Sequence, residues 1–96
     1  MPTIIATVTV QEGKMDDALE AIRTIVPGVR ENEPGALAYV AHTVTGEGNE
    51  NLIVFYEKYE DAAAMKTHMD NLMETLGPLL PFIDPNADMK ICEEII

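Results

Sequence analysis

The segment from Ala36 to Tyr59, ALAYVAHTVTGEGNENLIVFYEKY, decides the fold of this chain. It contains two runs rich in β-branched and aromatic residues, 36–44 and 52–59, separated by glycine, asparagine and glutamate. This pattern predicts two antiparallel strands joined as a hairpin. Both runs carry apolar side chains at odd and at even positions, so neither face of the predicted sheet is polar throughout.

The residues before this hairpin predict a strand and then a helix. Thr3–Val10 is rich in β-branched residues and alternates between two faces, as a strand does. From Met15 to Val29, apolar side chains recur every three or four positions, which is typical of an amphipathic helix. Pro27 lacks a backbone donor and clashes with the preceding turn, so we expect a kink or a broken last segment there.

The residues after the hairpin predict a second helix and a last strand. The helical pattern runs from Asp61 to Leu76 and stops at Gly77-Pro78. A short helical turn is expected at 79–83 and a strand at 89–95. The order β-α-β-β-α-β predicts an α+β, ferredoxin-like sandwich with a four-stranded antiparallel sheet, formed by one domain over residues 1–96.

The two-sided apolar character of the sheet predicts a partner. Two helices can cover only one face, and a chain of 96 residues buries only about 60 to 65 per cent of its unfolded surface. A second copy of the chain is the simplest cover for the other face. We therefore expect a homodimer packed sheet to sheet.

The composition excludes several classes of partner. Six Lys and Arg against 17 Asp and Glu give a net charge of -11, which repels nucleic acid and anionic membrane surfaces. No apolar stretch approaches the roughly 18 residues that span a bilayer. The N-terminal residues have no basic stretch, so no secretory signal is expected, and the single Cys92 favours a reducing cytoplasm.

Several motifs, in this order and spacing, resemble the antibiotic biosynthesis monooxygenase domain family, which includes small quinol monooxygenases. They are Ile25-Val26-Pro27, Glu33-Pro34-Gly35 with Tyr39 after it, Val54-Phe55-Tyr56-Glu57-Lys58-Tyr59, and Ala62 to His68. The resemblance covers nearly the whole chain and implies a dimeric α+β barrel. It also implies oxidation of a quinol or other small phenol by molecular oxygen without flavin, haem or metal. Some members catalyse isomerisation or have no known reaction.

Two histidines are the first candidates for proton transfer in such a reaction. His68 lies at the edge of the apolar stripe of the second helix and could project toward the sheet. A half-exposed structural histidine fits the same position equally well. His42 shares a strand face with Val40 and Val44, and the resemblance implies that this side lines a pocket beneath the helices. Alternatively, His42 caps the end of its strand.

The strand at 52–59 supplies the other candidates. Phe55, Glu57 and Tyr59 share one face, where the two rings could bind a substrate and a buried carboxyl could act as a base or bond to a histidine. A salt bridge from Glu57 to Arg23 or Arg30 explains this placement as well. Tyr39 and Tyr56 are further candidate donors, expected on the opposite face.

Two departures from the family pattern bear on the activity. Quinone-forming members place Asn and Trp where this chain has Phe55 and Tyr59, so an aromatic wall remains without the amide donor. Haem degradation is disfavoured because the chain has no Trp. No metal site is expected, since His42, His68 and Cys92 have no recognised ligand spacing. The alternatives are an isomerase acting on a small carbonyl compound, and a non-enzymatic dimer that binds small molecules or serves in stress.

Overall fold

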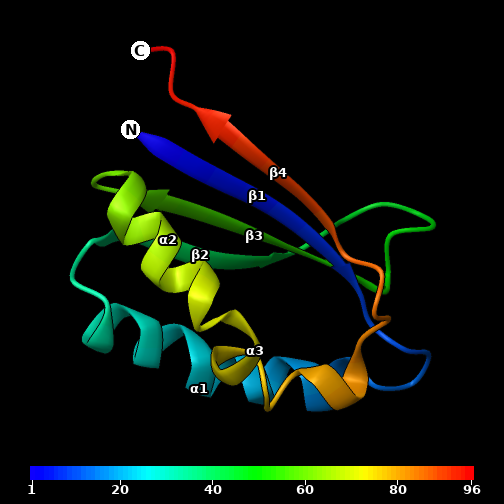
Figure 1. Cartoon of the computed structure of the whole chain (residues 1–96). Coiled ribbons are helices and arrows are strands. Elements are labelled where there is room, and N and C mark those ends of the chain that lie inside the picture. The colour runs from blue at the N-terminus through cyan, green and yellow to red at the C-terminus, as the bar shows by residue number, and fades with distance from the viewer.

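A four-stranded antiparallel sheet carries its helices on one face in this computed structural model, which describes all residues 1–96 (Figure 1). The sheet has the order β2-β3-β1-β4. Its strands are β1 (Pro2–Thr9), β2 (Ala36–Thr43), β3 (Leu52–Tyr59) and β4 (Asp88–Glu93). The helices are α1 (Met15–Asn32), α2 (Ala62–Asp70) and α3 (Leu72–Thr75), followed by the short 3-10 helix η1 (Leu80–Phe82). The predicted ferredoxin-like α+β fold is confirmed.

Helix α1 continues past Pro27 to Asn32, so the broken last segment, one of the two outcomes expected from the sequence, does not occur. Proline removes only the one hydrogen bond that would reach the carbonyl of Arg23. Ile25 and Val29 on either side are buried in the core, and their packing offsets that loss. The last turn of α1 therefore stays helical and carries Glu33 toward α2.

The second predicted helix is divided into α2 and α3 at Asn71. Asp61 caps α2, since its side chain accepts a hydrogen bond from the N–H of Ala64 at 2.8 Å. At the other end, the Asn71 side-chain amide donates to the carbonyl of Thr67 at 3.0 Å. The Asn71 backbone N–H turns instead to the carbonyl of His68 at 3.2 Å. Competition by this side chain for a helical carbonyl interrupts the helix.

The two faces of the sheet differ in what covers them. The face beneath the helices holds the core, including Ile4 and Val8 of β1 and Ile53 of β3. On the outer face, Val54 is half-buried and Ile5 is 41% exposed, and no helix of the chain packs on them (Figure 1). None of the helices has the length and apolarity that crossing a membrane requires.

Candidate active site

The turn after α1 packs tightly against the start of α2. The Glu60 N–H donates to the carbonyl of Gly35 at 2.9 Å. A Cβ on Gly35 would lie 2.6 Å from the Cβ of Ala64, closer than two carbons can approach. The absence of a side chain at Gly35 therefore allows Glu33, two residues earlier, to face His68 on α2.

His68 is fully buried and lies between two carboxyl groups. Its Nδ1 is 2.9 Å from Oε1 of Glu33, and its Nε2 is 3.5 Å from Oε1 of Glu57. Contact with an ionised Glu33 requires Nδ1–H to be the donor. Nε2 is the one buried side-chain nitrogen or oxygen of the chain without a hydrogen-bond partner. Such an atom costs free energy in a core, so it marks a position with a use other than packing.

Glu57 lies on the helix-covered face of β3 and is 4% exposed. The Tyr59 hydroxyl donates to its Oε1 at 2.6 Å. Burial raises the pKa of the Glu57 carboxyl above its usual range, although the bond from Tyr59 and the charge of His68 act in the opposite direction. Glu57 consequently holds a proton more readily than an exposed carboxyl does, and it faces a nitrogen with which that proton can be exchanged.

Aromatic rings enclose this pair. The ring centroid of His68 is 5.2 Å from that of Tyr39 and 5.6 Å from that of Tyr59, and Tyr39 also packs on Phe55 at 5.9 Å. Burial, followed by the charge of Glu57, raises the pKa of Tyr39, while burial and the hydrogen bond to Glu57 raise the pKa of Tyr59. Both hydroxyls are therefore neutral at physiological pH, and that of Tyr59 acts as a donor.

An apolar cavity of about 490 Å³ opens beside Glu57. It is enclosed by the sheet, the α2–α3 junction, α3, η1 and the segment leading into β4, and 11 of its 14 lining residues are hydrophobic. The residues that line it are Ala6, Val8, Tyr39, Phe55, Glu57, Leu72, Met73, Leu76, Leu80, Ile83, Asp84, Pro85, Ala87 and Met89. This size suits a small ring compound, and Glu57 is the buried ionisable carboxyl on its wall.

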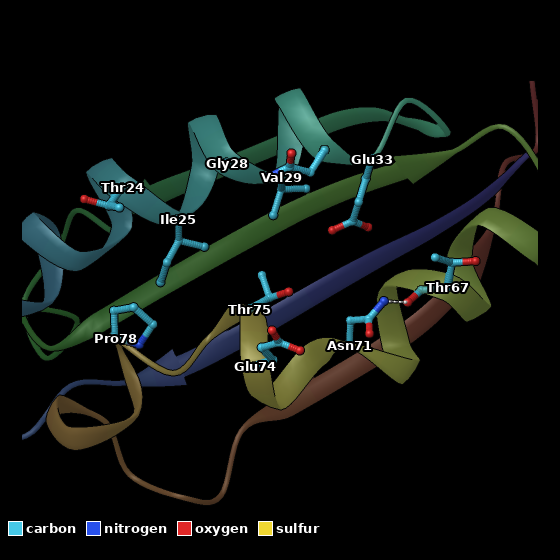
Figure 2. A pocket seen from close by; sticks show the side chains of 11 residues that line it. Thr24, Ile25, Gly28, Val29, Glu33, Thr67, Asn71, Glu74, Thr75 and Pro78 are labelled. Atoms are coloured by element: carbon cyan, nitrogen blue, oxygen red, sulfur yellow. Dashed lines mark hydrogen bonds between the residues drawn. The ribbon is translucent and has the colours of Figure 1, made fainter.

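A second hollow of about 510 Å³ lies between α1 and the α2–α3 segment (Figure 2). Only two of its 11 lining residues are hydrophobic. Figure 2 shows Glu33 extending from the end of α1 into this polar cleft, opposite Thr67 and Asn71. The side chain of Glu33 is 17% exposed, against 5% for Glu57.

The structure brings five of the seven predicted site residues together: His68, Glu57, Phe55, Tyr59 and Tyr39. Tyr39 pairs with Glu57 across the sheet and lies beneath the helices, so its expected place on the opposite face was wrong. Tyr56 pairs with Val40 on the outer face, as expected.

His42 is not part of this cluster. It pairs with Val54 on the outer face, is exposed, and its Nδ1 lies 3.2 Å from the carbonyl of Val54. The expectation that its side of the strand lies beneath the helices was therefore wrong. Alternation correctly grouped His42 with Val40, but the register against β3 decides which side the helices cover.

Neither arginine proposed as a partner of Glu57 reaches it. Arg23 lies 3.6 Å from Glu20, and Arg30 Nη2 donates to the carbonyl of Tyr39 at 3.1 Å. The sequence did not identify Glu33 as a site residue, and named it only within the Glu33-Pro34-Gly35 motif. Glu33 and His68 are 35 residues apart, and no spacing rule links them. The structure has no group of three or more His, Cys, Asp or Glu side chains arranged to hold a metal ion.

Comparison with known proteins identifies a family and a shared fold. The antibiotic biosynthesis monooxygenase family description matches residues 1–72. A Caulobacter crescentus protein described as a candidate antibiotic biosynthesis monooxygenase has a TM-score of 0.83 at 21% identity, over 99% of this chain and 90% of that one.

Two further solved structures show the same fold at low identity. One, described as an antibiotic biosynthesis monooxygenase, has a TM-score of 0.78 at 23% identity over the whole of both chains. A Mycobacterium tuberculosis protein has a TM-score of 0.80 at 11% identity, over 99% of this chain and 95% of that one. No curated protein matches the chain. At these identities, the structural likeness establishes the fold alone.

Proposed function

Because this chain belongs to the antibiotic biosynthesis monooxygenase family, we propose that it oxidises a quinol or related small phenol with molecular oxygen and without a cofactor. The observation that carries the proposal is the buried Glu57 on the wall of an apolar cavity, with His68 directly behind it. A phenol must lose its hydroxyl proton before it gives an electron readily to oxygen. A site for this reaction therefore needs a base that faces an apolar space.

Substrate binding is assigned to the aromatic wall. The Phe55 ring lines the cavity and offers a flat surface for the substrate ring. Tyr39 also lines the cavity, and its neutral hydroxyl can donate to a substrate oxygen. Tyr59 acts through Glu57, whose carboxyl it holds in place. The methionines Met73 and Met89 line the same cavity and give it adaptable walls.

Glu57 is the proposed base and His68 the proposed acceptor behind it. A raised pKa makes the ionised Glu57 a stronger base than an exposed carboxylate. Once Glu57 has taken the proton, His68 Nε2 is the nearest basic atom, and Glu33 lies 2.9 Å from Nδ1 on the other side of the ring. The substrate anion is then left in a cavity whose wall is mostly apolar.

The redox chemistry balances between substrate and oxygen. The quinol anion gives one electron to O₂, and the two radicals combine to form a bond between a ring carbon and oxygen. Protonation of the outer oxygen and loss of the hydrogen on that carbon break the O–O bond. Water leaves and a carbonyl remains, so one quinol and one O₂ give one hydroxyquinone and one water.

Oxygen uptake with a panel of hydroquinones tests the proposal. We expect uptake above the spontaneous rate, incorporation of one ¹⁸O atom from ¹⁸O₂ into the product, and no effect of added catalase. Oxygen return on adding catalase would reveal hydrogen peroxide and therefore an oxidase. No uptake with any quinol would reject the oxygenase and favour proton-transfer chemistry at the same cavity.

The outer face of the sheet supports a homodimer. Val54 and Tyr56 of β3 and Val40 of β2 form a half-buried apolar patch that borders the exposed Ile5. We propose that a second copy covers this patch through its own sheet, since an isologous contact needs only one apolar surface. Sedimentation equilibrium at micromolar concentration should give twice the 10.6 kDa chain mass, and a lone folded chain would contradict this.

A further inference from the structure

His68 lies between two carboxyl groups that line different hollows of the molecule. Glu57 lines the apolar cavity, and Glu33 lines the polar cleft. One ring nitrogen of His68 faces each of them, at 3.5 Å for Glu57 and 2.9 Å for Glu33. We infer that Glu57, His68 and Glu33 form a proton path that connects the apolar cavity with the water of the polar cleft.

The exposure of the three groups gives the path a direction. The side chain of His68 is fully buried and that of Glu57 is 5% exposed, so both have less contact with water than Glu33 does. Glu33 is 17% exposed and also borders a smaller hollow formed with Pro34, Glu60 and Asp61. A proton that reaches Glu33 can therefore pass to solvent without crossing the cavity that holds the substrate.

No other acid or base competes for His68. Of the elements packed on it, β2 presents Tyr39 and β3 presents Tyr59, and both hydroxyls are held neutral by raised pKa values. The guanidinium of Arg30 is turned to the backbone carbonyl of Tyr39. The unpartnered Nε2 is thus left with Glu57 as its exchange partner, and Nδ1 with Glu33.

The path matters most when a substrate fills the cavity, and its use in turnover rests on the proposed oxygenase function. A bound ring blocks the direct access of water to Glu57. Glu57 must still lose the proton taken from the substrate hydroxyl, and a proton must return when water is formed. A route through the opposite side of the site permits both transfers while the cavity stays dry, and the overall proton balance of the reaction is unchanged.

Exchange of the His68 ring N–H with water, followed by NMR of ¹⁵N-labelled protein, tests the path without any substrate. Glu33→Gln keeps the shape and an acceptor oxygen for Nδ1–H but cannot take up the proton. We expect exchange about 10-fold slower or more than in wild type, in line with the usual contribution of one acid-base group. Glu31→Gln removes the same charge at an exposed position of α1 and is the matched control, expected to leave exchange unchanged.

Turnover gives a second and separate readout. We expect Glu33→Gln to lower kcat about 10- to 100-fold with KM within about two-fold, because the substrate does not touch Glu33. Glu33→Ala should show the same loss, and added formate should restore activity because it can enter from the cleft. Formate should not rescue Glu33→Gln, whose side chain fills the space.

The two readouts separate the path from the activity. If exchange and kcat in Glu33→Gln equal those of Glu31→Gln, the path is refuted while the oxygenase assignment stands. If the wild type oxidises no quinol, the proposed function fails, and slower exchange in Glu33→Gln still supports the path. Absence of formate rescue in a folded Glu33→Ala protein would contradict a route through the cleft.

Discussion

Replacement of Glu57 by glutamine should lower turnover strongly without destabilising the fold. The Gln oxygen can still accept the hydrogen bond from the Tyr59 hydroxyl, which lies 2.6 Å from Oε1 in the wild type. The same Oε1 is the atom that lies 3.5 Å from Nε2 of His68, so this nitrogen stays without a hydrogen-bond partner, as in the wild type. The variant therefore retains the bond from Tyr59, but it loses the group proposed to accept the substrate proton.

The magnitude of the stability change follows from this bond and from the loss of the buried charge. Burial raises the pKa of Glu57, so replacing the ionised carboxyl by a neutral amide favours the variant near neutral pH. Exchanging a charge-assisted bond from Tyr59 for a neutral one costs about 1 kcal/mol. We expect the stability of Glu57→Gln to lie within about 1 kcal/mol of that of the wild type near pH 7. In a domain of this size, each kcal/mol corresponds to about 4 to 8 °C in Tm.

The difference should grow with pH. The folded pKa of Glu57 is raised above its unfolded value, so the carboxyl stabilises the fold most when it is protonated, below the unfolded pKa. This contribution is lost as the pH rises through the raised folded pKa. Glutamine does not titrate, so the stability of Glu57→Gln relative to wild type should be lowest at acidic pH and largest at alkaline pH.

Urea denaturation at several pH values and initial oxygen uptake check both halves of this prediction. Removal of a general base should lower kcat about 100- to 10,000-fold. The reasoning is refuted if Glu57→Gln is less stable than wild type by more than about 1 kcal/mol at pH 8, because the bond from Tyr59 would then not form. It is equally refuted if the variant keeps wild-type turnover.

Three further changes test the packing around the site and the outer face. Gly35→Ala should lower the free energy of unfolding measured in urea by about 1 to 3 kcal/mol, because the new Cβ meets that of Ala64. Adding Ala64→Gly should restore part of this stability. If it restores none, the steric explanation is contradicted. Phe55→Ala should lower the free energy of unfolding by about 3 to 5 kcal/mol and raise the KM for quinols, whereas Phe55→Leu should keep most of the stability. An unchanged KM in a folded Phe55→Ala protein would show that the Phe55 ring does not bind the substrate. Val54→Lys places a charge in the outer apolar patch and should convert the proposed dimer to a monomer in sedimentation experiments. The circular dichroism spectrum of the variant should remain that of a folded protein. A dimer that persists would place the interface elsewhere.

The sequence predicted the fold because each element has its own local signal. The strand predicted at 52–59 has the same bounds as β3, since its alternation is uninterrupted and turn residues flank it. The end of α1 and the division of α2 from α3 were not predicted. They depend on the packing of Val29 beside Pro27 and on one side-chain bond from Asn71, neither of which alters the apolar periodicity.

The sequence predicted those parts of the candidate site that lie on a single strand or helix. It missed the parts that depend on how two strands or helices are placed relative to one another. Alternation along β3 placed Phe55, Glu57 and Tyr59 together, and all three are buried on one face. The positions of Tyr39 and His42 depend on the register between β2 and β3, which the alternation of either strand leaves open. Glu33 reaches His68 only through the tight turn at Gly35.

The energetics of the buried cluster favour a chemical role over a structural one. A small domain gains stability from every apolar side chain on the helix-covered face, yet here that face holds a carboxyl and an imidazole. Apolar residues of similar volume often serve as well as, or better than, a buried ionic group in a core, particularly where one nitrogen has no partner. Packing alone therefore does not account for His68 and Glu57 beside an apolar cavity. The proposed proton transfer would account for them, because it needs a base of raised pKa, a second base within reach and a route to water, roles that we assign to Glu57, His68 and Glu33 in turn.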